Sequence, residues 1–207
     1  SDVYKRQGHA MRCLTLAKEL RKKANVQFIC RRRKGSLVRQ IKSEGFVVYE
    51  LSDAVLKINA EESSAVDWLG TTQEQDVQDC APILEKINPD WVIVDHYGID
   101  KFWQDSLKKY YKKLLIIDDL ANREHNCNLL LDQNFYKDKS VRYENLVSKE
   151  CRTLLGPRYA LLREEFLTTS SNLRGEGLNK ILVYFGGSDI KNNTVKVLKA
   201  IKFCKQV

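Results

Sequence analysis

The sequence lacks any long apolar segment. Its longest strongly apolar runs, such as Leu114–Ile117 and Ile181–Phe185, are only as long as a β-strand, whereas a helix needs about 20 apolar residues to cross a bilayer. The first seven residues also lack the apolar core of a secretory signal peptide. The sequence therefore predicts a cytoplasmic protein that has no membrane partner.

Motifs that bind metals or form covalent intermediates are absent as well. The six cysteines are scattered between positions 13 and 204 without a CxxC pair, which argues against a zinc ribbon or a thioredoxin-type site. The sequence has no HExxH motif, no metal-spaced group of histidines and no serine nucleophile elbow. We therefore expect no metal ion and no cofactor, and we expect most cysteines to be buried as small apolar side chains.

Positive charge is in excess, because the formal net charge is +8. A nucleic-acid partner would require basic residues gathered on one face, preferably with stacking aromatic rings. A positive field would equally steer an anionic diphosphate into a site. The clearest basic run, residues 31–34, is most simply a solvated loop. We therefore expect no nucleic-acid partner.

Short apolar runs alternate with amphipathic stretches along the chain, which is typical of an α/β fold with a parallel sheet. The runs at 91–95 and 114–119 are too apolar to have a solvated face, as in strands covered on both sides. Other strands are expected at 26–30, 46–51, 127–132 and 180–185. Helices are expected at 11–23, 36–45, 71–87, 100–112 and 192–204. The region 133–178 is expected to be irregular, broken by a short helix near Leu161–Leu167.

Two domains are expected from this pattern. The polar stretch from Thr168 to Gly177 is a linker candidate, so residues 1–170 form one domain and residues 178–207 begin a second, truncated one. One strand and one helix cannot enclose a core by themselves. Because a sheet of this kind starts with a strand, we also expect the first strand to be missing or replaced and residues 1–7 to be non-native.

Three segments carry residues suited to chemistry. Gly8 and His9 precede the first expected helix, where glycine admits an anion to free N–H groups and histidine can act as a general base; a capping or surface histidine is the alternative. Asp95, His96 and Tyr97 follow a buried strand, at the sheet edge where such folds bind ligands. There Asp95 could orient or accept a proton, and Tyr97 could donate a hydrogen bond to a sugar hydroxyl or leaving group.

The third segment, Gly186-Gly187-Ser188, lies between an expected strand and a helix, so its amides could cradle a diphosphate. A tight turn is the alternative, since the segment lacks the full P-loop and GxGxxG patterns. Asp118 and Asp119 also follow a buried strand, but without further ligands nearby they favour a strand terminus over a metal site. Asp100 most simply caps the next helix.

Five segments together resemble the PseG/SpsG family of UDP-sugar hydrolases of pseudaminic acid biosynthesis. They occur in the family's order and span nearly the whole chain: GHAMRCLTLA (8–17), WVIVDHYGID (91–100), LLIIDDLANREHNCNLLLDQN (114–134), GPRYALLREEF (156–166) and ILVYFGGSDIKNNT (181–194). The resemblance implies a GT-B-like architecture similar to the MurG glycosyltransferases, with two Rossmann-like domains facing each other across a cleft.

The resemblance also implies an activity. The family hydrolyses UDP-2,4-diacetamido-2,4,6-trideoxy-β-L-altropyranose, with water attacking the anomeric carbon with inversion and without a metal. It implies that His9 is the catalytic base, that Tyr97 lies at the sugar, and that Gly186, Gly187 and Ser188 face the diphosphate. We add Gly8, Arg12, Asp95 and His96 as candidate substrate-binding residues. The chain departs from the family pattern at Arg6, which replaces the first glycine of Gly-x-Gly-His.

The expected protein is a monomer with a UDP-sugar as its small-molecule partner. Two other functions stay open at this point: a GT-B glycosyltransferase that uses a UDP-sugar donor, and a non-catalytic subunit that binds a nucleotide sugar. The hydrolase interpretation depends on a spatial prediction. His9 and Tyr97, far apart in the sequence, must meet at the same edge of the sheet, opposite the turn at residues 186–188.

Overall fold

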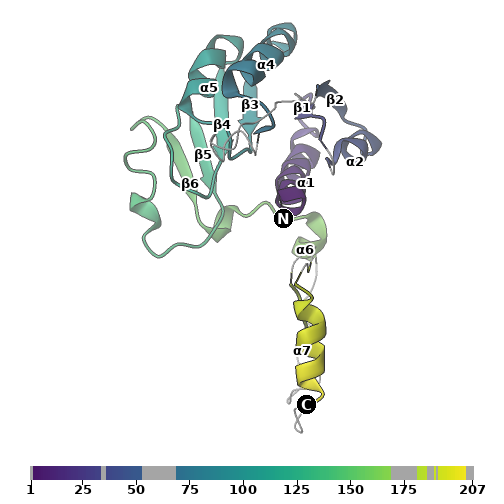
Figure 1. The fold of residues 1–207 in the computed structure, drawn as a ribbon. Helices are drawn as coiled ribbons and strands as arrows, with labels where there is room; N and C mark the ends of the chain where they lie inside the picture. Colours follow the sequence, from purple (N-terminus) through teal and green to yellow (C-terminus); the bar gives the residue numbers. More distant parts are fainter. Residues whose placement is uncertain are drawn as a thin grey trace.

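Two parallel sheets form the framework of the chain (Figure 1). The structure, a computed structural model, describes residues 2–33, 36–52, 69–168, 181–185, 189 and 191–203, with side chains from residue 8 onward. The first sheet pairs β1 (Gln27–Arg31) with β2 (Val47–Leu51). The second has the order β3 (Trp91–Val94), β4 (Lys113–Ile117), β5 (Leu129–Asp132) and β6 (Arg152–Leu155), all parallel. The predicted Rossmann-like α/β class is confirmed.

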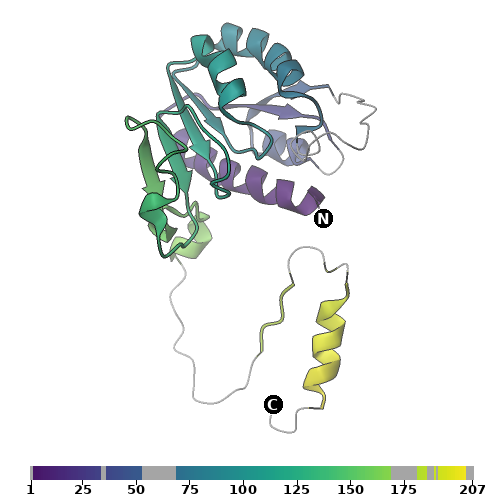
Figure 2. The same ribbon diagram turned by 60° about the vertical axis from the view of Figure 1, so that its left-hand side comes forward.

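Helices cover both faces of the second sheet (Figure 2). On one face, Leu114 and Ile116 of β4 pack in a core with residues of α4 (Gln73–Ile87) and α5 (Lys101–Leu107). On the other face, Leu115 and Ile117 pack with residues of α1 (Asp2–Leu20). Alternate residues of β4 thus enter two different cores, which is why the strand is apolar throughout. The other α-helices of the described residues are α2 (Val38–Ser43), α6 (Glu164–Thr168) and α7 (Asn193–Ile201).

Local capping fixes where α4 and α5 begin. The Thr72 hydroxyl accepts a hydrogen bond from the Gln75 N–H, and the Asp100 carboxylate accepts one from the Phe102 N–H. The predicted capping role of Asp100 is therefore confirmed. The helix expected at 36–45 is shorter in the structure, because α2 begins only at Val38, after the N-cap residue Leu37, and ends at Ser43.

The first helix begins earlier than the sequence predicted. Gly8 and His9 were expected before its first turn, but α1 begins at Asp2 and passes through both residues. Residues 2–7 include Lys, Arg and Gln, which favour helix, and an acidic residue in the first turn favours a helix start. The N–H groups near His9 therefore lie inside the helix, so the expected anion site at a helix N-terminus is absent at this position.

Two strand predictions also fail. The strand β6 lies in the stretch that was expected to be irregular; it is short and holds only two apolar residues, and its register with β5 defines it. Conversely, residues 181–185 are not in a strand. A strand requires a hydrogen-bonded neighbour, and none of the described segments provides one there. Figures 1 and 2 show α7 away from both sheets, and the division into domains at residues 170 and 178 stays a prediction.

Candidate functional site

One face of α1 meets the end of β3. His9, Arg12 and Cys13 lie three and four residues apart, so their side chains share that face. All three contact Asp95, which directly follows β3. His9 Nδ1 lies 2.5 Å from Asp95 Oδ1, Arg12 Nε lies 2.5 Å from Oδ2, and Arg12 Nη2 lies 2.5 Å from Oδ1. The Cys13 thiol is 3.6 Å from Oδ2. A carboxylate from the sheet thus joins α1 to β3.

The Asp95 carboxylate is ionised. Its side chain is only 1% exposed, and burial by itself would raise its pKa. The hydrogen bonds from Arg12 and His9, together with their charges, hold the pKa of Asp95 below its ordinary value instead. Burial opposes the charge of Arg12 in the same way, but the bonds to Asp95 keep the pKa of the guanidinium raised. The pair is therefore charged at neutral pH.

This charge state assigns the ring protons of His9. An ionised carboxylate can only accept hydrogen bonds, so the Nδ1 atom of His9 carries the proton that it shares with Asp95. Arg12 Nη2 lies 2.9 Å from the same nitrogen, but it is closer to Asp95 Oδ1, the stronger acceptor. The remaining ring nitrogen, Nε2, is then the basic atom of His9. A histidine oriented by a carboxylate in this manner is suited to general base catalysis.

Tyr97 completes the cluster from the loop after β3. Its ring packs edge-on against the His9 ring, with 4.5 Å between the ring centroids and an angle of 85° between the planes. The structure therefore brings His9 and Tyr97 together at one edge of the sheet, as the sequence predicted. The third part of that prediction, Gly186, Gly187 and Ser188, lies outside the described residues.

Asp119, at the end of β4, holds Tyr97 from the other side. The Tyr97 hydroxyl donates a hydrogen bond of 2.6 Å to Asp119 Oδ1, and Asn134 Nδ2 donates one of 3.0 Å to Oδ2. Arg12 Nη1 is 3.9 Å from Oδ2. Burial, followed by the bond to Asp119, raises the pKa of Tyr97 well above its usual value. Tyr97 therefore stays a protonated phenol at neutral pH.

A buried polar layer supports these residues from beneath. The Tyr143 hydroxyl lies 3.1 Å from both Asp118 Oδ2 and Asp132 Oδ2, and its side chain is almost fully buried. Arg123 pairs with Asp118 at 2.8 Å, and Arg142 pairs with Asp132 at 3.2 Å. Asp118 therefore has a structural role. Among the described residues, no three His, Cys, Asp or Glu side chains gather as a metal site would need.

The other predicted binding residues differ in what their side chains contact. Arg12 directs two of its nitrogens to Asp95, so its guanidinium organises the site. His96 points Nδ1 at the N–H of Gly98, at 3.0 Å, and so stabilises its own loop. Gly8 is exposed on α1, and a Cβ added there would meet no atom within 4 Å. Contact of these three residues with substrate stays a prediction.

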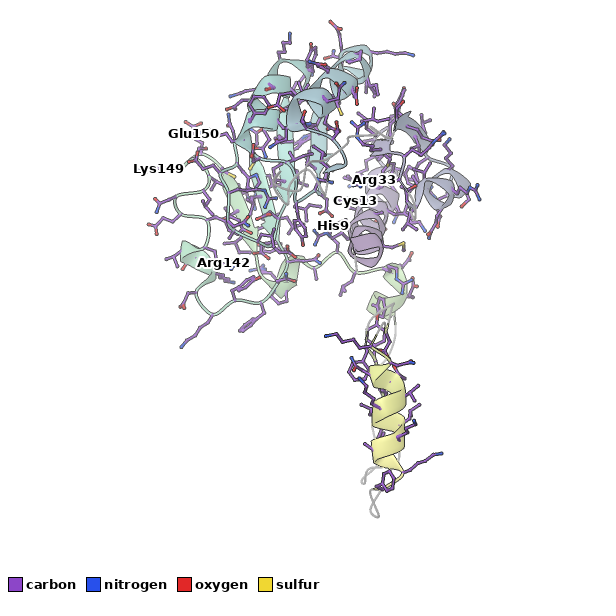
Figure 3. The ribbon with its side chains drawn as sticks, viewed as in Figure 1. His9, Cys13, Arg33, Arg142, Lys149 and Glu150 are labelled. Carbon is purple, nitrogen blue, oxygen red and sulfur yellow. The ribbon has the colours of Figure 1, made fainter. Side chains whose placement is uncertain are left out.

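Sequence reasoning missed several contributors. Asn134, Arg142 and Tyr143 come from the region that was expected to be irregular, and no spacing pattern marks them. Asp119 could have been identified from the sequence, because it follows a buried strand just as Asp95 does. Figure 3 places Arg142 toward the same end of the sheet as His9 and Cys13, while Lys149 and Glu150 lie toward the other end.

Comparison with known proteins gives two informative matches. The chain is 30% identical, over 191 residues, to the UDP-2,4-diacetamido-2,4,6-trideoxy-beta-L-altropyranose hydrolase of Campylobacter jejuni; the match covers 92% of this chain and 59% of that protein. It is 28% identical, over 201 residues, to an uncharacterised protein of Methanocaldococcus jannaschii, covering 94% of this chain and 37% of that one. No protein-family model matches the chain. The first match confirms the resemblance seen in the sequence motifs. The chain spans less than two thirds of either relative.

Proposed function

We propose that this chain carries the base and the sugar-facing residues of an enzyme that hydrolyses a nucleotide-activated sugar. The observation that carries the proposal is the contact of His9 with both Asp95 and Tyr97 at the carboxyl edge of a parallel sheet. The proposed substrate is UDP-2,4-diacetamido-2,4,6-trideoxy-β-L-altropyranose, on the pathway to pseudaminic acid. The similarity to a relative named for that reaction supports this choice.

In the proposed reaction, His9 Nε2 accepts a proton from water while the water oxygen bonds to the anomeric carbon. The bond between that carbon and the diphosphate oxygen breaks, and its electron pair leaves with UDP. Water attacks from the face opposite UDP, so the configuration inverts. Asp95 stabilises the imidazolium that forms, because its carboxylate already accepts the Nδ1 proton.

The remaining parts of the proposal concern the leaving group, the cellular location and the partners of the protein. We place the diphosphate of UDP against Gly186, Gly187 and Ser188, whose amides would neutralise the charge on departing UDP. This placement rests on the family resemblance. Across the described residues, no helix is both long enough and apolar enough to cross a membrane. We further propose that the protein acts as a cytoplasmic monomer without a nucleic-acid partner.

The distinguishing experiment supplies the UDP-sugar with no acceptor other than water. It uses the longest product that the gene encodes, because the chain spans only 59% of its hydrolase relative. Release of UDP together with free sugar is the expected result. If UDP appears only after an acceptor sugar is added, the protein is a glycosyltransferase. If it binds the UDP-sugar without turnover under either condition, it is a binding subunit.

A further inference from the structure

The Tyr97 hydroxyl has one proton, and the structure directs this proton to Asp119. The hydroxyl donates to Asp119 Oδ1 at 2.6 Å, and a phenol has no second O–H. The lone pairs of the phenol oxygen are therefore what Tyr97 can offer to a ligand. This geometry favours an acceptor role for Tyr97. The sequence-based expectation that it donates a hydrogen bond to a sugar hydroxyl or to the leaving group stays a prediction.

Asp119 is held firmly enough to impose this direction. Asn134 Nδ2 occupies its second carboxylate oxygen at 3.0 Å. Its backbone carbonyl accepts hydrogen bonds from the Arg142 guanidinium at 2.7 Å and the Tyr136 hydroxyl at 3.2 Å. These contacts fix both the main chain and the side chain of Asp119, which is only 18% exposed.

We propose that Asp119 is a positioning residue, which turns the Tyr97 oxygen toward the sugar as an acceptor that stabilises positive charge at the anomeric carbon. The inference rests on the proposed hydrolase function. A glycosyl transition state resembles an oxocarbenium ion, so an oriented oxygen beside it lowers the barrier. The phenol remains protonated by its bond to Asp119, so it is not a nucleophile, which agrees with a single inverting displacement.

The charges around Tyr97 suit this role. His9 and Arg12 face it from α1, Asp95 lies at the end of its own strand, and Asp119 lies at the end of β4. Arg12 approaches both carboxylates, with Nε 2.5 Å from Asp95 and Nη1 3.9 Å from Asp119. Two carboxylates and one guanidinium leave the cluster with a negative balance while His9 is neutral. A developing cation at the sugar is favoured by that balance.

The test compares Asp119→Asn, Tyr97→Phe and the double variant in the longest gene product. We expect each single change to lower kcat by about 10- to 100-fold with little change in KM, as for a lost transition-state interaction. The double variant should be no slower than Tyr97→Phe, because Asp119 acts through the phenol. Asp90→Asn is the matched control: Asp90 is an exposed carboxylate, paired with Lys112, and its change should alter neither constant.

A second measurement is independent of turnover. The Tyr97 phenol is titrated by ultraviolet absorbance, as the difference between proteins with and without Tyr97→Phe. Its pKa should fall in Asp119→Asn, since a bond that raises it is lost. An unshifted titration would mean that Asp119 does not act on the phenol, whereas the kinetic comparison with the double variant reports whether that contact matters for turnover.

The outcomes separate the two proposals. Independent, additive losses in the double variant, or an unshifted Tyr97 titration, would overturn the positioning role. If the unchanged protein releases no UDP, the hydrolase proposal fails, and the phenol titration still decides whether Asp119 controls Tyr97. If Asp119→Asn does not fold, Asn134→Ala replaces it, because this change frees the carboxylate without removing it. It should slow turnover only while Tyr97 is present, and equal slowing on top of Tyr97→Phe would overturn the proposal.

Discussion

The packing of the fold does not require a glycine at position 8. It lies within α1 on an exposed face, where a Cβ would meet no atom within 4 Å. Glycine inside a helix costs about 1 kcal/mol relative to alanine. We therefore expect Gly8→Ala to raise the free energy of unfolding by about 0.5–1 kcal/mol, measured by urea denaturation. If the sugar nucleotide approaches this face, the same change should weaken its binding, measured by calorimetry; unchanged affinity would remove Gly8 from the site.

Asp95 should affect how the free energy of unfolding changes as the pH falls. Its folded-state pKa lies below the ordinary aspartate value, so its charge stabilises the fold above about pH 4, and this contribution is lost as pH falls through the lower, folded pKa. Asp95→Asn should therefore be less stable than the unchanged chain at pH 7. It should also lose less stability between pH 7 and about pH 3. Urea unfolding at both pH values measures this, and parallel losses would contradict the assigned ion pair.

At the residue scale, the sequence located the core of the site but not its supports. His9, Asp95 and Tyr97 were predictable because each lies in a motif at an expected strand or helix end. Arg142 and Asn134 were not, since they reach the site from irregular backbone. Their positions depend on how that segment folds over β4 and β5, and periodicity carries no information about such a path.

At the element scale, a buried ion cluster joins the two sheets. Arg31, at the end of β1, places Nη2 2.6 Å from Asp76 and 2.7 Å from Asp79, both on α4. The Trp103 indole on α5 also donates to Asp76, at 2.9 Å. The side chains of Arg31 and Asp76 are each 6% exposed. The expectation that the basic run 31–34 is a solvated loop is therefore wrong for its first residue.

Removing the guanidinium should destabilise the fold strongly. Arg31→Met leaves Asp76 buried without its charge partner, so we expect a loss of about 3–5 kcal/mol in the free energy of unfolding. Arg32→Met is the matched control, because Arg32 is 72% exposed and pairs with Glu50 at the surface. Its change should cost less than about 1 kcal/mol. Equal effects of both changes in urea denaturation would refute the linking role.

His125 ties α5 to the segment before β5, and it should make the fold sensitive to mild acid. Gln104 Nε2 lies 2.8 Å from its Nδ1, and the ring is fully buried. Burial, followed by the charge of Arg123, lowers the pKa of His125 from 6.5 to about 4. Between these values the unfolded chain binds a proton that the folded chain does not, so stability falls as pH drops from about 6.5 to 4.

The expected size of this loss is about 2–3 kcal/mol. His125→Gln, which keeps a polar side chain but cannot titrate, should lose correspondingly less stability between pH 7 and pH 4.5. Urea denaturation of both proteins at the two pH values gives the comparison. The buried carboxylates are common to both, so their contribution cancels. An identical loss in both proteins would mean that His125 is not held neutral.

Hydrophobic periodicity predicted helices and strands correctly where both faces of the element, or clearly one face, are buried. The run at 114–119 gave β4, and the stripe at 71–87 gave α4 despite Pro82, because Cys80 and Leu84 on either side of the proline are buried. It failed for β6, whose residues are half exposed and whose strand depends on pairing with β5. It also failed for residues 181–185, where an apolar run alone does not make a strand.

At the scale of the whole molecule, the site lies where separate parts of the chain meet. α1 contributes His9, the loops that follow β3 and β4 contribute Asp95 and Asp119, and the segment between β5 and β6 holds Asp119 in place. The α/β class and the meeting of His9 with Tyr97 followed from the sequence, because parallel strands bring their carboxyl ends to one edge. The position of the predicted diphosphate turn at residues 186–188 and the two-domain division stay predictions.

In the proposed reaction, His9, oriented by Asp95, activates water against the anomeric carbon. Proton NMR of the longest gene product with its UDP-sugar tests this most directly, by following the first sugar anomer formed and the rate of UDP release. We expect inversion, and a rate about 10²- to 10⁴-fold lower for His9→Asn, whose side-chain amide can still donate to Asp95. Retention of configuration, or an undiminished rate in His9→Asn, would contradict it.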